Sequence, residues 1–275
     1  MDHYAVFGHP VAHSRSPWIH ARFAAATGVS LRYRRIDAAP ACFEIAVRAF
    51  FAGGGHGANV TLPHKHAACA LADVVLPRAR GAGAVNTLTA LPDGRIAGDN
   101  TDGTGLVVDL VDNHGVGLAG RRVLLIGAGG AAAGVLDALL ATRPAVLCVV
   151  NRTPERARAL ATARDAARID AGGFELLERV PAFDVVINAT AASLDGKTPP
   201  VPAHCIAAHS VCYDLAYAAG GTAFNAWAHA QGAAQVLQGT GMLVEQAAES
   251  FRLWRGVRPP TAEIRTRLDR LLDAG

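Results

Sequence analysis

The chain has 275 residues, which is enough for one large domain or two ordinary ones, and 51% of them are hydrophobic. Its net charge is +3, and the basic residues are dispersed instead of forming the dense stripe that binds nucleic acid. No apolar run approaches the roughly 20 residues that cross a bilayer, and no basic and apolar leader opens the chain. The five cysteines have no close pairing, which predicts free thiols in a reducing compartment. We therefore expect a cytoplasmic protein that binds neither nucleic acid nor membrane.

Strand and helix signals alternate in the N-terminal part of the chain. We expect short strands at residues 4–8, 31–36 and 57–60, and helices at 16–26, 40–52 and 64–71. Ser16-Pro17 suits the start of the first of these helices. The strand pair 84–91 and 95–98 predicts a hairpin, and a helix at 102–113 and a glycine-rich stretch at 114–120 follow it. This stretch is the best candidate for a hinge.

The pattern of apolar residues changes near residue 121. Continuous apolar strands are expected at 122–126, 145–150, 183–188 and 210–215, with helices ending near 141 and 163 after the first two. Two helices, at 240–255 and 261–272, close the chain. Fully apolar strands that alternate with helices are typical of a parallel sheet covered on both faces.

A glycine pattern lies between the first of these strands and its helix. Gly127-x-Gly129-x-x-Ala132 has the spacing that lets a backbone turn tightly and approach a pyrophosphate at a helix N-terminus. A chain rich in Ala and Gly also produces such matches by chance. The position after a five-residue apolar strand favours a dinucleotide site.

The end of the next strand bears on which dinucleotide is bound. A site for NAD would carry Asp or Glu there to hold the ribose 2′-hydroxyl, whereas this strand ends in Asn151-Arg152-Thr153, with Arg156 following. A guanidinium can hold a 2′-phosphate through two hydrogen bonds, and a carboxylate would repel it. Taken alone, these residues are more simply a helix cap with surface arginines. Together with the glycine pattern they favour NADP.

In the N-terminal part, Lys65 begins a helix and Asp102 precedes another. Each has an ordinary explanation, as a solvated surface lysine and as a helix N-cap. Small polar residues are nevertheless dense at the element ends, namely Ser14, Ser16, Asn59, Thr61, Asn86, Thr87, Asn100 and Asp102. Ligand sites in α/β proteins form at the carboxyl ends of strands, so this density indicates a site for a polyhydroxylated small molecule. The pairs His9/His13 and His64/His66 lack further ligands at a suitable spacing, and we expect no metal site.

In combination these segments resemble the shikimate dehydrogenase family. The matching segments in the first half are Val6-Phe7-Gly8-His9-Pro10, His13-Ser14-Arg15-Ser16-Pro17, Asn59-Val60-Thr61-Leu62-Pro63-His64-Lys65, Gly83-Ala84-Val85-Asn86-Thr87 and Gly98-Asp99-Asn100-Thr101-Asp102-Gly103. Those in the second half are 127–131, Asn151-Arg152-Thr153, Asn188-Ala189-Thr190, Tyr213-Asp214 and the segment 241–248. They keep the family's order from about residue 4 to about residue 256.

The resemblance implies two α/β domains with the active site in the cleft between them. Residues 1–102 plus 240–275 would form the substrate-binding and catalytic domain, and residues 103–239 a Rossmann-type NADP-binding domain with a parallel sheet. The implied activity is the reversible NADPH-dependent reduction of 3-dehydroshikimate to shikimate in the biosynthesis of aromatic amino acids.

The resemblance also assigns roles to individual residues. It implies that Lys65 and Asp102 are catalytic, and that the substrate is bound by Ser14, Ser16, Asn59, Thr61, Asn86, Tyr217 and Gln246. The implied cofactor-binding residues are Gly127, Ala128, Gly129, Gly130, Ala131, Asn151, Arg152, Thr153, Arg156, Leu215 and Gly239. Two segments depart from the family pattern near the nicotinamide position, because Ala191-Ala192 replaces a common Ser and Gln238 replaces a common Asp.

Two alternatives stay open at this stage. A sister enzyme of the same fold would oxidise quinate or an aminated shikimate analogue, and Arg152 argues against NAD as its cofactor. A non-catalytic protein that senses dinucleotides is the other alternative, although it would have no need of Lys65 and Asp102. The sequence leaves a homodimer open.

Overall fold

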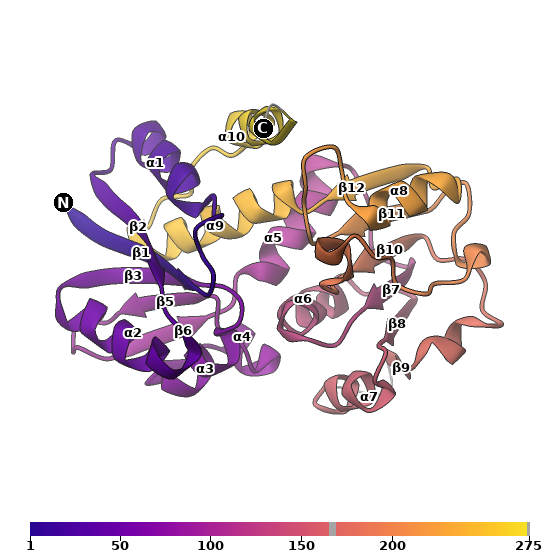
Figure 1. Ribbon diagram of the computed structural model, residues 1–275, viewed down its shortest axis with the longest axis horizontal. Coiled ribbons are helices and arrows are strands. Elements are labelled where there is room, and N and C mark those ends of the chain that lie inside the picture. The colour runs from indigo at the N-terminus through magenta and orange to yellow at the C-terminus, as the bar shows by residue number, and fades with distance from the viewer. Residues whose placement is uncertain (165–168, 274–275) are drawn as a thin grey trace. The chain divides into compact units, whose positions relative to one another are not determined.

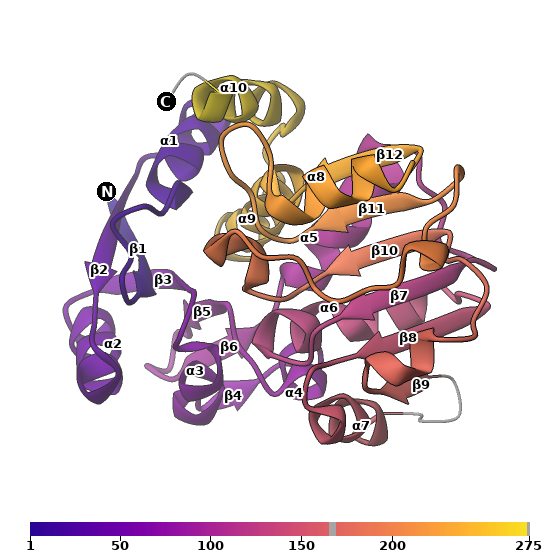
Figure 2. The same ribbon diagram turned by 45° about the vertical axis from the view of Figure 1, so that its right-hand side comes forward.

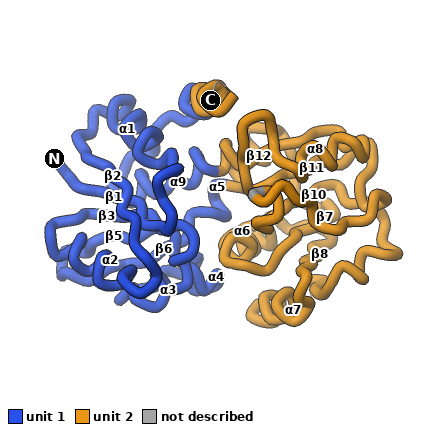
Figure 3. The backbone as a smooth tube through the Cα atoms, in the orientation of Figure 1, with its two compact units in different colours: residues 1–105, 243–266 blue, residues 106–242, 267–275 orange. Residues whose placement is uncertain are grey.

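The computed structural model describes residues 1–164 and 169–273 (Figure 1). The chain forms two compact units, coloured separately in Figure 3: unit 1 comprises Met1–Gly105 and Leu243–Thr266, and unit 2 comprises Leu106–Met242 and Arg267–Gly275. The chain passes between them within the helices α5 (Asp102–Val108), α9 (Thr240–Arg255) and α10 (Ala262–Asp273). The division expected from the sequence falls at the starts of α5 and α9. It differs from the compact units at the C-terminus, where residues 267–275 group with unit 2.

Unit 1 contains a mixed six-stranded sheet in the order β2-β1-β3-β5-β6-β4. Its strands are β1 (Asp2–Gly8), β2 (Leu31–Asp37), β3 (Gly55–Val60), β4 (Val74–Val75), β5 (Thr87–Ala90) and β6 (Ile96–Asp99). β1 runs parallel to both β2 and β3, whereas β5 runs antiparallel to β3 and β6. The β5–β6 pair is the hairpin that the sequence predicts.

Helices cover both faces of this sheet. They are α1 (Ser16–Thr27), α2 (Phe43–Ala52) with the preceding 3-10 turn η1 (Pro40–Cys42), α3 (Lys65–Leu71), α4 (Pro77–Ala82) and much of α9. α1 has a proline in its first turn and ends at Gly28, whose φ of 70° suits glycine. One core joins Phe7 and Val60 of the sheet to Phe43 of α2. The burial of these apolar side chains holds the strand ends in place for the site.

On the other face, aromatic residues of α1 and α9 surround a fully buried histidine. The ring of His20 stacks on Tyr33, with centroids 4.3 Å apart, and also packs against Phe23, Phe251 and Trp254. Neither ring nitrogen makes a hydrogen bond among the described residues. Burial lowers the pKa of His20 to about 3, although the nearby Asn59 side chain offsets part of the shift. The imidazole is therefore neutral in the folded protein at physiological pH.

The depressed pKa of His20 predicts acid sensitivity. At pH values between the unfolded-state pKa of 6.5 and the folded-state pKa of about 3, His20 is protonated in the unfolded chain and neutral in the folded chain. Stability from this residue is therefore complete above pH 6.5 and declines as the pH falls toward 3. Between about pH 7.5 and about pH 5 this residue alone should lower the free energy of unfolding by about 2 kcal/mol.

Urea unfolding at these two pH values measures the effect. His20→Phe keeps an aromatic ring in the same surroundings, so it should reduce the loss of stability between the two pH values by about that amount. His229→Phe removes an exposed histidine of unit 2 and serves as the matched control. Equal pH dependence in wild type and His20→Phe would show that the buried imidazole does not cause the acid sensitivity.

Unit 2 contains a fully parallel six-stranded sheet in the order β12-β11-β10-β7-β8-β9, which Figure 2 shows strand by strand. Its strands are β7 (Arg122–Ile126), β8 (Val146–Val150), β9 (Ile169–Gly172), β10 (Val185–Asn188), β11 (Val211–Asp214) and β12 (Gln235–Gln238). Strand order reverses between β7 and β10, as in the doubly wound dinucleotide-binding sheet. Ligands of such sheets bind at the carboxyl ends of the strands at this reversal.

Helices and short turns cover both faces of the second sheet. They are α6 (Gly130–Ala141), α7 (Pro154–Thr162), α8 (Ala223–Ala230) and the 3-10 turns η4 (Phe174–Leu177), η5 (Ala192–Asp195) and η6 (Ala203–Cys205). One core joins Val123 and Leu125 to Leu136 of α6, and a second joins Leu124 and Ile126 to Phe224 of α8. Alternate residues of one strand thus enter opposite cores, which explains why the β7 sequence is apolar throughout.

The helix expected at 102–113 is α-helical only to Val108. It continues as a π-helical turn, η2 (Asp109–Asn113), which begins at a fully buried aspartate. The Tyr213 hydroxyl donates to Asp109 at 2.7 Å, and a Cβ on Gly241 would lie 2.0 Å from the same carboxylate. Gly241 therefore has to be a glycine because the backbone of α9 passes directly over Asp109.

Candidate active site

Lys65 and Asp102 form an ion pair within unit 1. Lys65 is the first residue of α3 and Asp102 the first of α5, so two helix starts bring the two charges together. The side chains are 16% and 8% exposed, respectively, which leaves a small part of each open to a ligand. A hydrogen bond from Val85 N–H to the Lys65 carbonyl, at 2.9 Å, fixes the backbone of the lysine. The two residues that the sequence singles out for chemistry are therefore in contact.

Amide side chains surround this pair. Asn86 donates to Asp102 Oδ1 at 2.7 Å and lies 3.4 Å from Gln246 Oε1. Asn86 also accepts the backbone N–H of Thr101 at 2.9 Å, which fixes which end of its amide faces Asp102. The structure thus brings together four of the predicted residues, Lys65, Asp102, Asn86 and Gln246.

Asn59 and the two serines extend the polar cluster. The Tyr33 hydroxyl donates to Asn59 Oδ1 at 2.7 Å, and Asn59 Nδ2 lies 3.2 Å from the Asn86 carbonyl. Burial raises the pKa of Tyr33, and a hydrogen bond with the Ser16 side chain opposes the rise. Ser14 Oγ lies 3.3 Å from Ser16 Oγ. A continuous set of contacts therefore runs from the serine pair to the Lys65–Asp102 pair.

Thr61 follows β3 at the same end of the sheet. Its N–H donates to the Phe7 carbonyl at 2.9 Å, and its carbonyl accepts the His64 N–H at 3.0 Å. A Cβ on Gly8 would lie 2.6 Å from the Thr61 methyl group, so the two strand ends touch here. These contacts involve the backbone and the methyl group of Thr61, and its hydroxyl makes no hydrogen bond within the described part of the chain.

Three hydroxyl groups lie beneath the amides, and one of them, that of Ser250, was not singled out from the sequence. Ser250 Oγ lies 2.8 Å from Thr87 Oγ1, 3.0 Å from Asn59 Nδ2 and 3.3 Å from Thr101 Oγ1. All three hydroxyl-bearing residues are fully buried. They hold the two asparagine amides in one orientation, because each amide hydrogen is matched to an oxygen.

A group of charged residues fixes α9, the helix that carries Gln246. Arg78 of α4 donates to Asp99 of β6 and, at 3.0 Å, to Glu249 of α9. The hydrogen bond from Arg252, together with that from Arg78, lowers the pKa of Glu249 to about 2. Glu249 therefore stays ionised and α9 stays attached to α4 and β6 at physiological pH.

In unit 2, the glycine loop leads from β7 into α6. Gly127 has a φ of 110°, and its N–H donates to the Val150 carbonyl at 2.7 Å. Among the described residues, nothing lies within 4 Å of a Cβ built on Gly129, and no side chain caps the N-terminus of α6. The first N–H groups of a helix need partners, and an anion can supply them here. The predicted residues Gly127, Ala128, Gly129, Gly130 and Ala131 form this loop and first turn.

Asn151, Arg152 and Thr153 follow the neighbouring strand β8, beside the glycine loop. Asn151 Nδ2 donates to the Thr153 carbonyl at 2.9 Å, and Thr153 is the N-cap residue of α7. Arg152 and Arg156 are exposed, and neither guanidinium has an ion pair or hydrogen bond within the described ranges 1–164 and 169–273. The two guanidinium groups are thus available to a phosphate at this edge of the sheet.

Leu215 and Gly239 meet at the ends of β11 and β12. A Cβ on Gly239 would lie 2.1 Å from the Leu215 carbonyl, and Gly239 N–H donates to the Ala216 carbonyl at 3.0 Å. Gln238, which departs from the family pattern, accepts the Ala218 N–H at 3.1 Å. It thereby fixes the loop that contains Tyr217, which belongs to unit 2.

Asp214 is a buried residue of this edge that the sequence did not single out as a site residue. Ser193 and Thr222 donate to its Oδ2 at 2.5 and 2.6 Å, and Asn188 donates to its Oδ1 at 3.2 Å. Asn188 in turn accepts the Thr190 hydroxyl at 2.7 Å. These bonds join the ends of β10 and β11. Both carboxylate oxygens of Asp214 accept hydrogen bonds from the protein, so we assign Asp214 a structural role.

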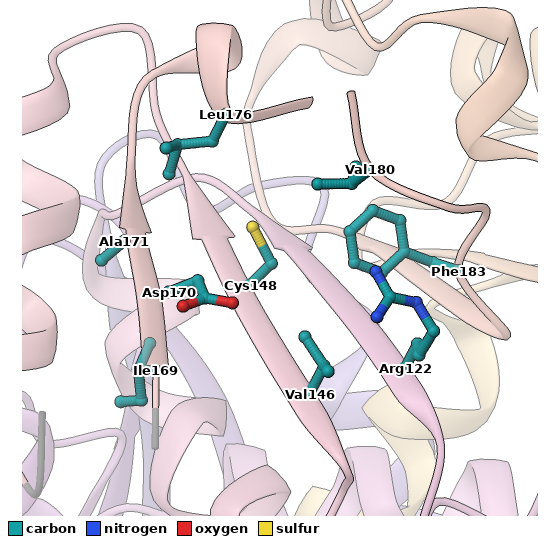
Figure 4. Close-up of a pocket in the computed structure, with 9 residues that line it drawn as sticks. All are labelled: Arg122, Val146, Cys148, Ile169, Asp170, Ala171, Leu176, Val180 and Phe183. Atoms are coloured by element: carbon teal, nitrogen blue, oxygen red, sulfur yellow. The ribbon is translucent and has the colours of Figure 1, made fainter. Parts of the chain in front are cut away.

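Elsewhere in unit 2, a pocket of about 340 Å³ lies over β8 and β9 (Figure 4). Burial raises the pKa of its Cys148 to about 12, so the thiol is unreactive. Arg122 at its rim lies 5.2 Å over the Phe183 ring.

Among the described residues, no three His, Cys, Asp or Glu side chains are placed to bind a metal ion together. None of the helices in that part of the chain is both long and apolar enough to cross a membrane.

Three family models match the chain. They describe the shikimate dehydrogenase substrate-binding domain over residues 6–88, shikimate/quinate 5-dehydrogenase over 109–195 and the shikimate 5′-dehydrogenase C-terminal domain over 239–268. The chain is also 57% identical to a protein from Halorhodospira halophila named shikimate dehydrogenase (NADP(+)), with 96% of each chain covered. The chain belongs to the shikimate dehydrogenase family. The family resemblance of the sequence motifs is thereby confirmed.

Solved structures share this fold. An Ael1 enzyme from Pseudomonas putida has a TM-score of 0.91 and 43% identity, with 98% of each chain covered. Shikimate 5-dehydrogenase from Thermus thermophilus, in complex with NADP(H) and shikimate, has a TM-score of 0.86 and 34% identity, with 99% of this chain and 100% of that chain covered. The predicted fold of two α/β domains, one of Rossmann type, is confirmed.

Proposed function

We propose that Lys65 and Asp102 carry out the acid–base step of shikimate oxidation and 3-dehydroshikimate reduction in this chain. The chain is an NADP-dependent oxidoreductase that interconverts these two compounds, as the names of its full-length relatives indicate. The observation that carries the assignment of residues is the Lys65–Asp102 ion pair, because it lies within the polar cluster that Asn86 and Gln246 complete.

The pair suits the chemistry at a ketone. Reduction places negative charge on the carbonyl oxygen, and a positioned ammonium stabilises that charge and donates the proton. Asp102 holds the Lys65 ammonium in place, and Asn86 in turn holds Asp102. In the reverse direction Lys65 accepts the proton of the alcohol. We assign the amides of Asn59, Asn86 and Gln246 to the ring hydroxyls, and the hydroxyls of Ser14 and Ser16 to the carboxylate.

The residues of unit 2 fit a phosphorylated dinucleotide. The first N–H groups of α6 can donate to a pyrophosphate, for which Gly129 leaves space. The exposed guanidinium groups of Arg152 and Arg156 can donate to a 2′-phosphate. Leu215 and Gly239 are the residues we assign to the nicotinamide end. NADP(H), when bound, supplies or takes the hydride. Tyr217 and Thr61 complete the assignment, as further residues that contact the substrate.

A spectrophotometric assay at the absorbance of NADPH tests the proposal. Shikimate and quinate are each offered with NADP⁺ and with NAD⁺, and we expect shikimate with NADP⁺ to give the highest kcat/KM. A preference for quinate would favour the sister-enzyme alternative. Tight NADPH binding without turnover of either alcohol would favour a non-catalytic dinucleotide sensor. A homodimer and a cytoplasmic location stay predictions.

A further inference from the structure

Strand β2 lies beside the loop that carries the serine pair. Arg35 of this strand donates from both Nε and Nη2 to the carbonyl of Ser14, at 2.9 and 2.7 Å. Two converging donors from one rigid guanidinium fix the position of that carbonyl more closely than one donor would. Arg35 therefore determines where the Ser14 backbone lies.

A second residue of β2 holds the start of the same loop. Asp37 accepts the Val11 N–H at 3.0 Å and bonds to His9 Nδ1 at 2.6 Å. The Ser14 N–H closes the turn onto the Val11 carbonyl at 3.0 Å. The loop is thus held at its start by Asp37 and at its end by Arg35. A loop fixed in this way presents its hydroxyl groups without an ordering cost when a ligand binds.

The guanidinium of Arg35 carries a positive charge that the described residues leave without an ion pair. Within residues 1–164 and 169–273, no carboxylate forms an ion pair with its guanidinium. The Ser14 hydroxyl belongs to the residue whose carbonyl Arg35 binds, so the cation lies within about one Debye length, about 8 Å, of that hydroxyl. By binding the carbonyl, Arg35 also masks a partial negative charge that would repel an anion.

We infer that Arg35 is a positioning residue that sets the affinity of the serine pair for the carboxylate of the substrate. This inference rests on the proposed function, in which Ser14 and Ser16 bind that carboxylate. The hydroxyl groups supply neutral donors, and Arg35 supplies the fixed positive charge behind them. Its effect should fall on substrate binding, since the carboxylate takes no part in the hydride and proton transfers.

Steady-state kinetics with shikimate and its uncharged methyl ester test the inference. Arg35→Gln should raise the KM for shikimate about tenfold and change kcat less than about threefold, because an exposed charge is partly screened. The KM for the methyl ester should rise much less, because the ester keeps the oxygen acceptors for the serine hydroxyls and lacks only the charge. Raising the salt concentration from about 50 to about 500 mM should raise the KM for shikimate more in wild type than in Arg35→Gln.

Two further variants complete the experiment. Arg32→Gln makes the same change in net charge from the opposite face of β2, and its KM and salt dependence should match wild type. Arg35→Lys keeps the charge without the two-donor geometry, so it should keep the salt dependence and show an intermediate KM. If Arg35→Gln weakened the methyl ester as much as shikimate, or weakened neither, the inference would be wrong. Failure of wild type to oxidise shikimate would instead refute the proposed function.

Discussion

Lys65→Ala should lower kcat by at least about 100-fold, the usual contribution of a positioned acid–base group. The KM for shikimate should change much less, because the charge of the ammonium matters most when negative charge develops on oxygen. Loss of the lysine also leaves Asp102, which is 8% exposed, without its cation, although Asn86 still donates to it. Initial rates of shikimate oxidation with saturating NADP⁺ measure the effect.

The chain offers a matched control for this variant. Lys197, the other lysine, is exposed and belongs to unit 2, so Lys197→Ala removes the same charge from a residue outside the polar cluster and should keep wild-type kinetics. Asp102→Asn should also lower kcat, since an amide no longer balances the ammonium. Thermal melts should show both active-site variants folded. A folded Lys65→Ala protein with a near-normal kcat would remove Lys65 from the mechanism.

The elements that the sequence predicted well are those whose pattern is strong within a few residues. β7 is an unbroken apolar run because each face of the strand enters a separate core, and the glycines after it mark the turn into α6. β9 and β12 were missed for the opposite reason. β9 contains Gly172, and β12 has two glutamines and no buried residue, so only pairing with the neighbouring strands identifies them.

The site residues also divide into those that a local sequence pattern indicates and those that it does not. Lys65, Asp102 and Asn86 lie at element ends, where a polar side chain in a short sequence pattern is conspicuous. Tyr33 and Ser250 lie inside a strand and a helix, and Ser250 is separated by 191 positions from Asn59, the side chain it orients. No local pattern indicates such a pairing. Arg35 was missed because β2 contains two other arginines, and an exposed arginine in such a strand is most simply a solvated surface residue.

The cofactor preference should depend on Arg152, with Thr153 and Arg156 in support. A 2′-phosphate carries up to two negative charges, and a charge-assisted hydrogen bond contributes about 1.5–3 kcal/mol. Removal of a two-donor arginine should therefore lower kcat/KM for NADP⁺ by roughly tenfold to several hundredfold. NAD⁺ lacks the phosphate, so its kcat/KM should change little in Arg152→Ala.

Measurements of kcat/KM for both cofactors in wild type and two variants test this electrostatic account. Arg152→Asp should weaken NADP⁺ further than Arg152→Ala, because a carboxylate repels the phosphate in addition to lacking a donor. Arg158→Ala is the control: it removes an exposed arginine of α7, the helix that follows Arg152, and this arginine lies 3.5 Å from Glu155 in an i,i+3 pair. Its cofactor ratio should equal that of wild type. If wild type prefers NAD⁺, or if Arg152→Ala leaves the ratio unchanged, then Asn151-Arg152-Thr153 is only the start of a helix, and a different group must distinguish the two cofactors.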